Sequence, residues 1–293
     1  MTELILQAIY SGLLAGGVYA LLSLGLALIF GTMRIINLAH GELVLLAAYF
    51  AYTLETRAGF HPLAAIPLAL LLVCACSLAV YFLVSRIRVQ GGQRELHTLM
   101  LTFAIGIILT NTILLIWSAD VRATATQGLQ VPLQVGVFYS MWSEIIFFGI
   151  SLVLVAGLWW WLSRSWYGRA VRAVSSNREA AKLMGINPHR TEWISFLIAG
   201  VLATFAGVAI YSSGVIFPSL GHALTIKAFI ISVLAGVGSI PGILAAALLI
   251  GVTEALTVTL FSSALQEMTG MVLFLLVLFV LPNGLFGAAA RRG

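Results

Sequence analysis

The chain has 293 residues, of which 61% are hydrophobic and only 9% are charged. A soluble domain averages about 25% charged residues and could not keep so much apolar surface out of water. The net charge of +5 comes from Lys and Arg clustered in a few loops, which indicates membrane topology rather than nucleic-acid binding. Composition therefore predicts an integral membrane protein.

The apolar runs have the length of membrane-spanning helices, and the short alternating segments of a membrane β-barrel are absent from the sequence. We predict spans at 5–30, 36–54, 63–84, 97–117, 142–162, 193–213, 226–240, 241–258 and 266–282. The first span contains small residues that permit close helix packing, namely Gly12, Gly16, Gly17 and Gly25. The expected fold is an all-α, polytopic bundle of eight or nine transmembrane helices, forming one domain over residues 1–293.

The number of predicted spans depends on residues 226–258. The sequence "AGVGSIPGI" within them should break any helix, because Pro lacks an N–H. If this stretch forms two spans, the basic segments all fall on one side, as the positive-inside rule requires. These basic residues are Arg34, Arg86, Arg88, Arg94, Arg164, Arg169, Arg172, Arg178, Lys182, Arg190, Arg291 and Arg292. We therefore predict nine crossings with the N-terminus outside, and eight if the stretch is one broken helix.

Loop 163–191 contains the polar stretch "SSNREAAKLMGINPHR" (Ser175–Arg190). Ser176 and Glu179 have the spacing of a capping box, and Gly185 can close a helix in the left-handed conformation. The pattern predicts a short helix from Asn177 to Met184. Its apolar side is small and knob-like, which favours docking on a partner protein over resting on the membrane surface. That side consists of Ala180, Ala181, Leu183 and Met184.

Polar residues within the spans are candidates for function, because ionisable groups are costly in a bilayer. Asn37, His40 and Glu42 open the second span, where they could touch a substrate or lock neighbouring helices together. A metal site is disfavoured, because residues two apart do not share a helix face.

Three further polar residues lie in later spans. Asn111, on the fourth span together with Thr98, Thr102 and Thr112, could bond to its own helix backbone or to a neighbouring helix, the interpretation we favour, or line a path. Lys227 and Glu254 could form a structural pair, the interpretation we favour, or line a path. Cys74 and Cys76 lie within an apolar span and are interpreted as buried thiols.

Three separated motifs resemble the branched-chain amino acid ABC importer permeases. They are "GTMRIINLAHGELVLLAAY" (Gly31–Tyr49), "GRAVRAVSSNREAAKLMGINPHRTEWISFLIAGVLATFAGVA" (Gly168–Ala209) and "LTIKAFIISVLAGVGSIPGILAAALLIGVTEAL" (Leu224–Leu256). The resemblance implies a single permease domain whose loop helix couples to an ATPase. Glu179, Ala180, Ala181 and Gly185 match that family's EAA-x-x-x-G core, and Leu183 and Met184 lie within it.

The resemblance also implies the partners. They would be a second homologous permease subunit, two cytoplasmic ATP-binding subunits and a periplasmic substrate-binding protein, in a bacterial inner membrane. ATP would be bound by the partner subunits, so this chain would need no cofactor and would not be an enzyme. The family is associated with branched-chain amino acids, other amino acids, amides and urea, and the sequence does not choose among them.

Two other classes of function are alternatives to the importer permease. A secondary active transporter of small polar solutes would need coupling groups, for which Glu42 and Glu254 are available. A membrane enzyme is disfavoured, because the sequence has no G-x-S-x-G or H-E-x-x-H motif and no cluster of acids.

Overall fold

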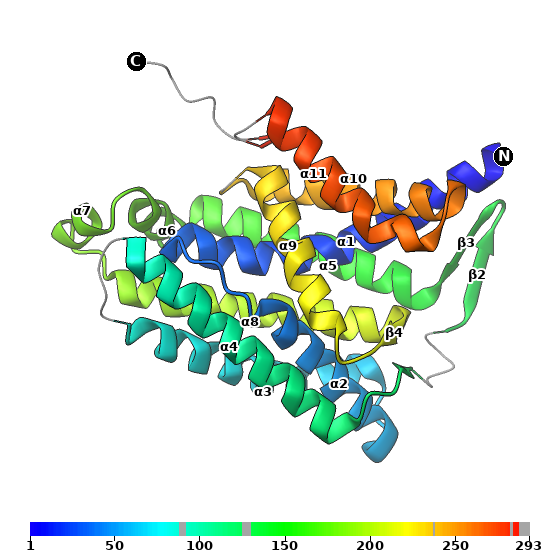
Figure 1. Cartoon of the computed structure of the whole chain (residues 1–293), viewed down its shortest axis with the longest axis horizontal. Coiled ribbons are helices and arrows are strands. Elements are labelled where there is room, and N and C mark those ends of the chain that lie inside the picture. The colour runs from blue at the N-terminus through cyan, green and yellow to red at the C-terminus, as the bar shows by residue number, and fades with distance from the viewer. Residues whose placement is uncertain (88–91, 125–129, 237, 282–283, 287–293) are drawn as a thin grey trace.

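The computed structural model describes residues 1–87, 92–124, 130–236, 238–281 and 284–286. Helices dominate this part of the chain (Figure 1). They are α1 (Thr2–Met33), α2 (His40–Ala58), α3 (Pro62–Ser85), α4 (Gly92–Trp117), α5 (Trp142–Arg164), α6 (Trp166–Ser176), α7 (Arg178–Leu183), α8 (Pro188–Ser213), α9 (Leu220–Ala235), α10 (Ile240–Leu260) and α11 (Gln266–Val280). A short 3₁₀ turn, Ser263–Leu265, precedes α11.

Each predicted span corresponds to one helix, so the polytopic helical bundle is confirmed. Among the described residues, seven helices are long and apolar enough to cross a membrane. The two remaining predicted spans are α2, which carries the charges Glu42, Glu55 and Arg57, and α9, which has only 16 residues. The predicted break after the seventh span is also present, because α9 ends at Gly236 (φ 86°) and Ser239 caps α10.

The glycines of α1 pack against α10. A Cβ added to Gly12 would lie 2.7 Å from the carbonyl oxygen of Gly251, and one added to Gly16 would lie 2.9 Å from that of Ala247. Neither helix could approach so closely with larger residues, which is the role expected for small residues in membrane helix packing. The largest buried cluster is contributed mainly by α1, α2, α8, α9 and α10.

Two small sheets lie at one end of the bundle, where the N-terminus also lies (Figure 1). Strand β1 (Arg122–Ala123) pairs with β4 (Val215–Ile216), and β2 (Pro132–Val135) pairs with β3 (Phe138–Met141). Gln7 of α1 bonds to the backbone of Tyr139 in both directions. The strands of the predicted loops 118–141 and 214–225 therefore lie at the same end of the bundle as the N-terminus, as predicted.

Helices α6 and α7 lie at the opposite end of the bundle (Figure 1). Arg34, just after α1, donates to the carbonyl of Ser175, so the first basic segment meets the loop 163–191. Helix α6 was not predicted, because its residues fall within the basic segment 163–191, which was interpreted as a loop. Arg291 and Arg292, which the topology prediction also used, lie outside the described residues.

Candidate functional site

The short loop helix forms where it was predicted, but its N-cap differs. Asn177 Oδ1 accepts hydrogen bonds from the backbone N–H groups of Glu179 and Ala180, at 3.1 and 3.0 Å. The predicted capping box of Ser176 with Glu179 is wrong, because Ser176 is the last residue of α6. Glu179 instead pairs with Lys182 at 2.7 Å, and this contact lowers the pKa of the Glu179 carboxyl.

Helix α7 ends as the sequence predicts, through Gly185. This residue has φ +78°, a left-handed conformation that suits glycine. The N–H of Ile186 bonds to the carbonyl of Ala181, and that of Gly185 bonds to the carbonyl of Lys182, both at 3.0 Å. These two bonds form a Schellman motif, which satisfies carbonyls at the helix end and fixes the direction of the following chain.

The exposed side of α7 differs from the predicted one at Ala181. This side chain is only 3% exposed, because α7 packs against α6 and α8, and its assignment to an exposed docking face is wrong. Leu183 and Met184 are 89% and 81% exposed, and Ala180 and Glu179 are also exposed. The apolar surface that projects from this end of the bundle is therefore Leu183–Met184, which we call the docking tip.

An ion pair that the sequence analysis missed anchors α7 to α8. Arg178 Nη2 lies 2.8 Å from Glu192 Oε1, and the Glu192 side chain is 1% exposed. Nearby, the Tyr81 hydroxyl donates to the carbonyl of His189, which ties α3 to the first turn of α8. The Tyr167 hydroxyl of α6 donates to the carbonyl of Thr191, and burial raises the pKa of this phenol. The loop helices are thus held on the first turns of α8.

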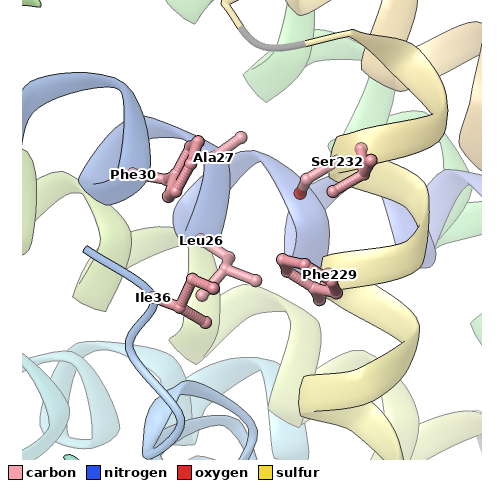
Figure 2. Close-up of a pocket in the computed structure, with 7 residues that line it drawn as sticks. Leu26, Ala27, Phe30, Ile36, Phe229 and Ser232 are labelled. Carbon is pink, nitrogen blue, oxygen red and sulfur yellow. The ribbon is translucent and has the colours of Figure 1, made fainter. Parts of the chain in front are cut away.

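A second group of polar residues lies inside the bundle, where α2 begins. His40 Nε2 lies 3.0 Å from the carbonyl oxygen of Leu22, which is eleven residues before the end of α1. Eleven helical residues span about 16 Å, so Leu22 lies that far along α1 from its C-terminal end. The chain therefore turns back at Arg34 and runs alongside α1 before α2 starts within the bundle. Figure 2 shows this returning segment, with Ile36 beside Leu26 of α1 and facing Phe229 of α9 across a narrow apolar crevice.

Helix α9 also begins inside the bundle and meets the start of α2. The Thr225 hydroxyl accepts from the N–H of Gly41 at 2.9 Å and lies 3.3 Å from the carbonyl of Leu38. A Cβ added to Gly41 would lie 2.1 Å from the carbonyl oxygen of Gly221. The first turns of two helices are therefore in backbone contact, an arrangement typical of the broken helices that build transporter sites.

Glu42 lies at this junction of two helix starts. Its side chain is 3% exposed, and its carboxylate is so near the first turn of α9 that a Cβ on Gly221 would lie 2.1 Å from Oε2. Negative charge is favoured at a helix N-terminus, where backbone N–H groups point outward. Oε2 has no hydrogen-bond partner among the described residues.

The structure brings Asn37, His40 and Glu42 together, and all three are buried. Asn37 Oδ1 accepts from the N–H of Ala39 at 3.1 Å, so Asn37 shapes its own turn. From α4, the Thr102 hydroxyl accepts from the N–H of Leu38 and donates to the carbonyl of Ile36. Thr102 is one of the hydroxyls of the fourth span that were expected to bond their own backbone or a neighbouring helix, and its partners here lie more than sixty residues earlier in the chain.

Asn111 does not join this group. It lies on the exposed face of α4, and its Nδ2 donates to the carbonyl of Ile107 one turn earlier at 2.8 Å. This bond to its own helix backbone is one of the roles predicted for it, and no bond from Asn111 to a neighbouring helix is seen among the described residues.

Lys227 and Glu254 form the pair considered from the sequence, with Nζ 2.9 Å from Oε2. The same Glu254 oxygen accepts from the Tyr19 hydroxyl at 3.0 Å and from Gln266 Nε2 at 3.3 Å. The ammonium of Lys227 lies 4.4 Å from the centre of the Tyr19 ring, a cation–π distance. This cluster joins α1, α9, α10 and the start of α11.

Cys74 and Cys76 are free thiols; Cys74 is buried, as predicted, whereas Cys76 is only half-buried. No group of three or more His, Cys, Asp or Glu side chains within the described ranges could hold a metal ion.

The bundle, with its seven long apolar helices among the described residues, defines a multi-pass helical membrane protein. The family profile described as "Branched-chain amino acid transport system / permease component" matches residues 8–281. The chain therefore belongs to the family of branched-chain amino acid transport permeases.

Relatives of known name agree with this assignment. The chain is 33% identical over 297 residues to the high-affinity branched-chain amino acid transport system permease protein BraD of Pseudomonas aeruginosa, covering 96% of this chain and 95% of BraD. It is 28% identical to LivH of Escherichia coli, with 96% and 95% covered. It is 27% identical to a LivH protein of Methanocaldococcus jannaschii, with 97% and 91% covered.

Two solved structures resemble the chain at low sequence identity. A metal-chelate type ABC transporter in an inward-facing conformation gives a TM-score of 0.48 at 18% identity, covering 94% of this chain and 86% of that one. PsaBC of Streptococcus pneumoniae in complex with Fab gives 0.44 at 16% identity, covering 96% and 92%.

Proposed function

We propose that this chain is the transmembrane permease subunit of a binding-protein-dependent ABC importer in a bacterial inner membrane. It would translocate branched-chain or related amino acids, driven by ATP hydrolysis in two cytoplasmic partner subunits. A second homologous permease and a periplasmic substrate-binding protein would complete the assembly. The relatives' names support the substrate class, since BraD and LivH are permeases for branched-chain amino acids.

The observation that carries the coupling role is the docking tip. Leu183 and Met184 expose nearly their whole side chains on a helix held by the Gly185 motif and by the Arg178–Glu192 ion pair. A flexible loop would lose entropy on binding, whereas a helix fixed in advance loses little. Two apolar side chains on a rigid projection suit insertion into a groove on a partner protein.

The translocation path is proposed to pass the junction of α2 and α9. Glu42 and the two helix starts supply polar groups in an otherwise apolar bundle, and the Lys227–Glu254 cluster supplies a second polar position. Asn111 is proposed to face the second permease subunit across the exposed side of α4, because an amide facing lipid would be costly.

The test is reconstitution. The chain would be co-expressed with its candidate ATP-binding, permease and substrate-binding partners, and leucine uptake would be measured in proteoliposomes. Uptake that requires both ATP and the binding protein is the expected result. Concentrative uptake by this chain alone under a proton or sodium gradient would instead establish a secondary transporter and overturn the proposal.

A further inference from the structure

A cavity of about 720 Å³ lies between the ends of α1 and α5, helix α6 and the start of α10, at the end of the bundle that carries the loop helices (Figure 1). Two exposed residues that line it, Arg34 and Arg172, are cationic, and none of its described lining residues is acidic. The wall farther inside is aliphatic and includes Leu24, Leu28 and Ile243. This combination suits a ligand with an anionic end and a hydrocarbon part.

The depth of the cavity matches one leaflet of a bilayer. Leu24 lies ten residues before Arg34, about 15 Å along α1, and the hydrocarbon core of a bilayer is about 30 Å thick. Trp159 and Trp160, which are 50% and 60% exposed near the end of α5, lie at the same end of the bundle. Exposed tryptophans are typical of the headgroup level of a membrane. The cavity therefore extends from this level to a depth that a lipid acyl chain reaches.

The two guanidinium groups at the rim retain donors for a ligand. Arg34 Nη2 donates to the carbonyl of Ser175 at 3.2 Å. Arg172 Nη1 donates to the carbonyl of Leu162 at 3.0 Å. Within the described part of the chain, neither arginine forms an ion pair. A guanidinium has five N–H donors in a planar arrangement that matches the oxygens of a phosphate, so each arginine can bind one.

The backbone of Arg34 supports a role for its side chain. Its φ is 54°, and it is one of two non-glycine residues with a positive φ in the described ranges. Glycine would adopt this left-handed conformation without a steric cost, whereas arginine bears one. Residues held in such conformations cluster at ligand sites. The one hydrogen bond that its side chain makes to the described chain is exposed, so a phosphate at the rim would add bonds that this position otherwise lacks.

We propose that this cavity binds an anionic phospholipid. The phosphate oxygens accept hydrogen bonds from Arg34 and Arg172, and one acyl chain packs against Leu24, Leu28 and Ile243. Basic pockets between membrane helices are known to recognise the headgroups of anionic lipids. The lipid would fill the space between α1, α5, α6 and α10 as a structural ligand and would not be transported. The inference does not depend on the proposed function.

The test is equilibrium binding of radiolabelled dioleoyl phosphatidylglycerol to the purified full-length chain in a neutral detergent. We expect saturable binding, which Arg34→Gln and Arg172→Gln should each weaken by about fivefold. Arg169→Gln is the matched control, because Arg169 is also exposed on α6 and donates to a backbone carbonyl but does not line the cavity. An equal loss of binding in Arg169→Gln and Arg172→Gln would show a diffuse attraction to positive charge and would overturn the site.

Gly31 allows a second test that leaves both arginines in place. It lines the cavity, and a Cβ added to it meets nothing within 4 Å, so the side chain of Gly31→Leu begins in open space. We expect this variant to bind phosphatidylglycerol about fivefold more weakly, with a melting temperature no lower than that of the unmodified protein. Gly149→Leu is the control, since a Cβ on Gly149 also has open space but lies outside the cavity. Equal binding by the two leucine variants would overturn the site.

Competition identifies the group that the site recognises. Dioleoyl phosphatidylcholine keeps the acyl chains without a net charge, and glycerol 3-phosphate keeps the phosphate without acyl chains. Each should displace the labelled lipid about tenfold less well than unlabelled phosphatidylglycerol does. The proposal would be overturned by equal displacement with phosphatidylcholine, which indicates an apolar groove, or with glycerol 3-phosphate, which indicates a site for free phosphate. Displacement by leucine would assign the cavity to the transported substrate and would also overturn it.

Discussion

Arg178 and Glu192 lie fourteen residues apart in the chain, on either side of the Gly185 turn, and their side chains meet at 2.8 Å. Arg178 is the first residue of α7, and Glu192 lies in the second turn of α8. The ion pair therefore joins the two ends of the segment 178–192, which carries the docking tip. A force applied to α7 by a partner would reach α8 through this contact as well as through the backbone.

We predict that breaking the Arg178–Glu192 ion pair weakens the coupling between ATP hydrolysis and uptake. Glu192→Gln removes the charge that balances Arg178, and loss of one partner of a buried pair costs about 3 kcal/mol. We expect leucine uptake to fall while the variant remains in the membrane, with ATP hydrolysis by the complex less dependent on the loaded binding protein. The double variant Arg178→Glu with Glu192→Arg restores a pair of opposite charges. Recovery of coupling in this variant would show that the ion pair is required, and not Glu192 itself.

The docking tip predicts a contact with the ATP-binding subunit. Leu183→Glu places a charge on its most exposed apolar residue and should weaken capture of that subunit by about 2–4 kcal/mol, or at least tenfold. Val137→Glu, an equally drastic change at an exposed position on the opposite end of the bundle, serves as the control. Capture that is as strong in Leu183→Glu as in the control would contradict docking at the tip.

Ala181→Glu is expected to act differently from Leu183→Glu. Its side chain is buried between the loop helices and α8, so a glutamate there would displace α7 rather than meet a partner. The expected outcome is a lower yield of folded protein in detergent, measured by size-exclusion chromatography. A fully stable variant that only lost the ATP-binding subunit would place Ala181 on the docking face after all.

We predict that substitution of Gly185 acts through the backbone conformation at the end of α7 and not through side-chain contacts. Gly185→Val forces a β-branched residue into the left-handed region at φ +78° and should cost about 1–2 kcal/mol. Gly185→Asn is the matched control, because asparagine tolerates this region. A Cβ at this position meets nothing within 4 Å, so any difference between the two variants in partner capture reports the helix end alone.

We predict that adding a single methyl group at the junction of α2 and α9 lowers the stability of the protein. Gly41→Ala and Gly221→Ala each place a Cβ 2.1 Å from an oxygen atom, and overpacking of this kind costs about 1–3 kcal/mol. We expect lower melting temperatures in detergent for both. Gly157→Ala, where an added Cβ has open space, should melt like the unmodified protein. Equal melting of all three variants would contradict the close contact.

Topology can be tested by single-cysteine labelling. After replacement of Cys74 and Cys76, we expect Val137→Cys to react with an impermeant maleimide in intact cells. Lys182→Cys should react only after the membrane is opened, since the basic loops are expected in the cytoplasm. Labelling of Lys182→Cys from outside would reverse the predicted orientation.

Features of the fold that depend only on residues close together in the chain could be predicted from the sequence. Span positions follow from apolar length, the break before Pro241 follows from proline geometry, and the end of α7 follows from Gly185. The neighbouring N-cap was assigned one residue too early, because Ser176 and Asn177 are both good caps and only the extent of α6 decides between them.

Features that depend on distant parts of the chain were not predicted. Thr225 reaches Gly41 across 184 residues, and no periodicity in either helix indicates that contact. The burial of Ala181 depends on α6 and α8, so helix composition alone could not separate it from Ala180. Glu192 lies directly before the predicted span 193–213, and an acid at the entrance of an apolar span was the one signal that could have indicated its buried partner.

The glycine contact between α1 and α10 has a consequence for biosynthesis. Helix α1 leaves the ribosome well before α10, because the helix against which Gly12 and Gly16 pack ends at Leu260. Chains are made from the N-terminus at roughly 5–20 residues per second, so this surface of α1 waits on the order of ten seconds or more for its partner. During that interval the glycine stripe faces lipid, the membrane insertion machinery or another nascent chain. The last third of the protein therefore completes a core that its first helix begins.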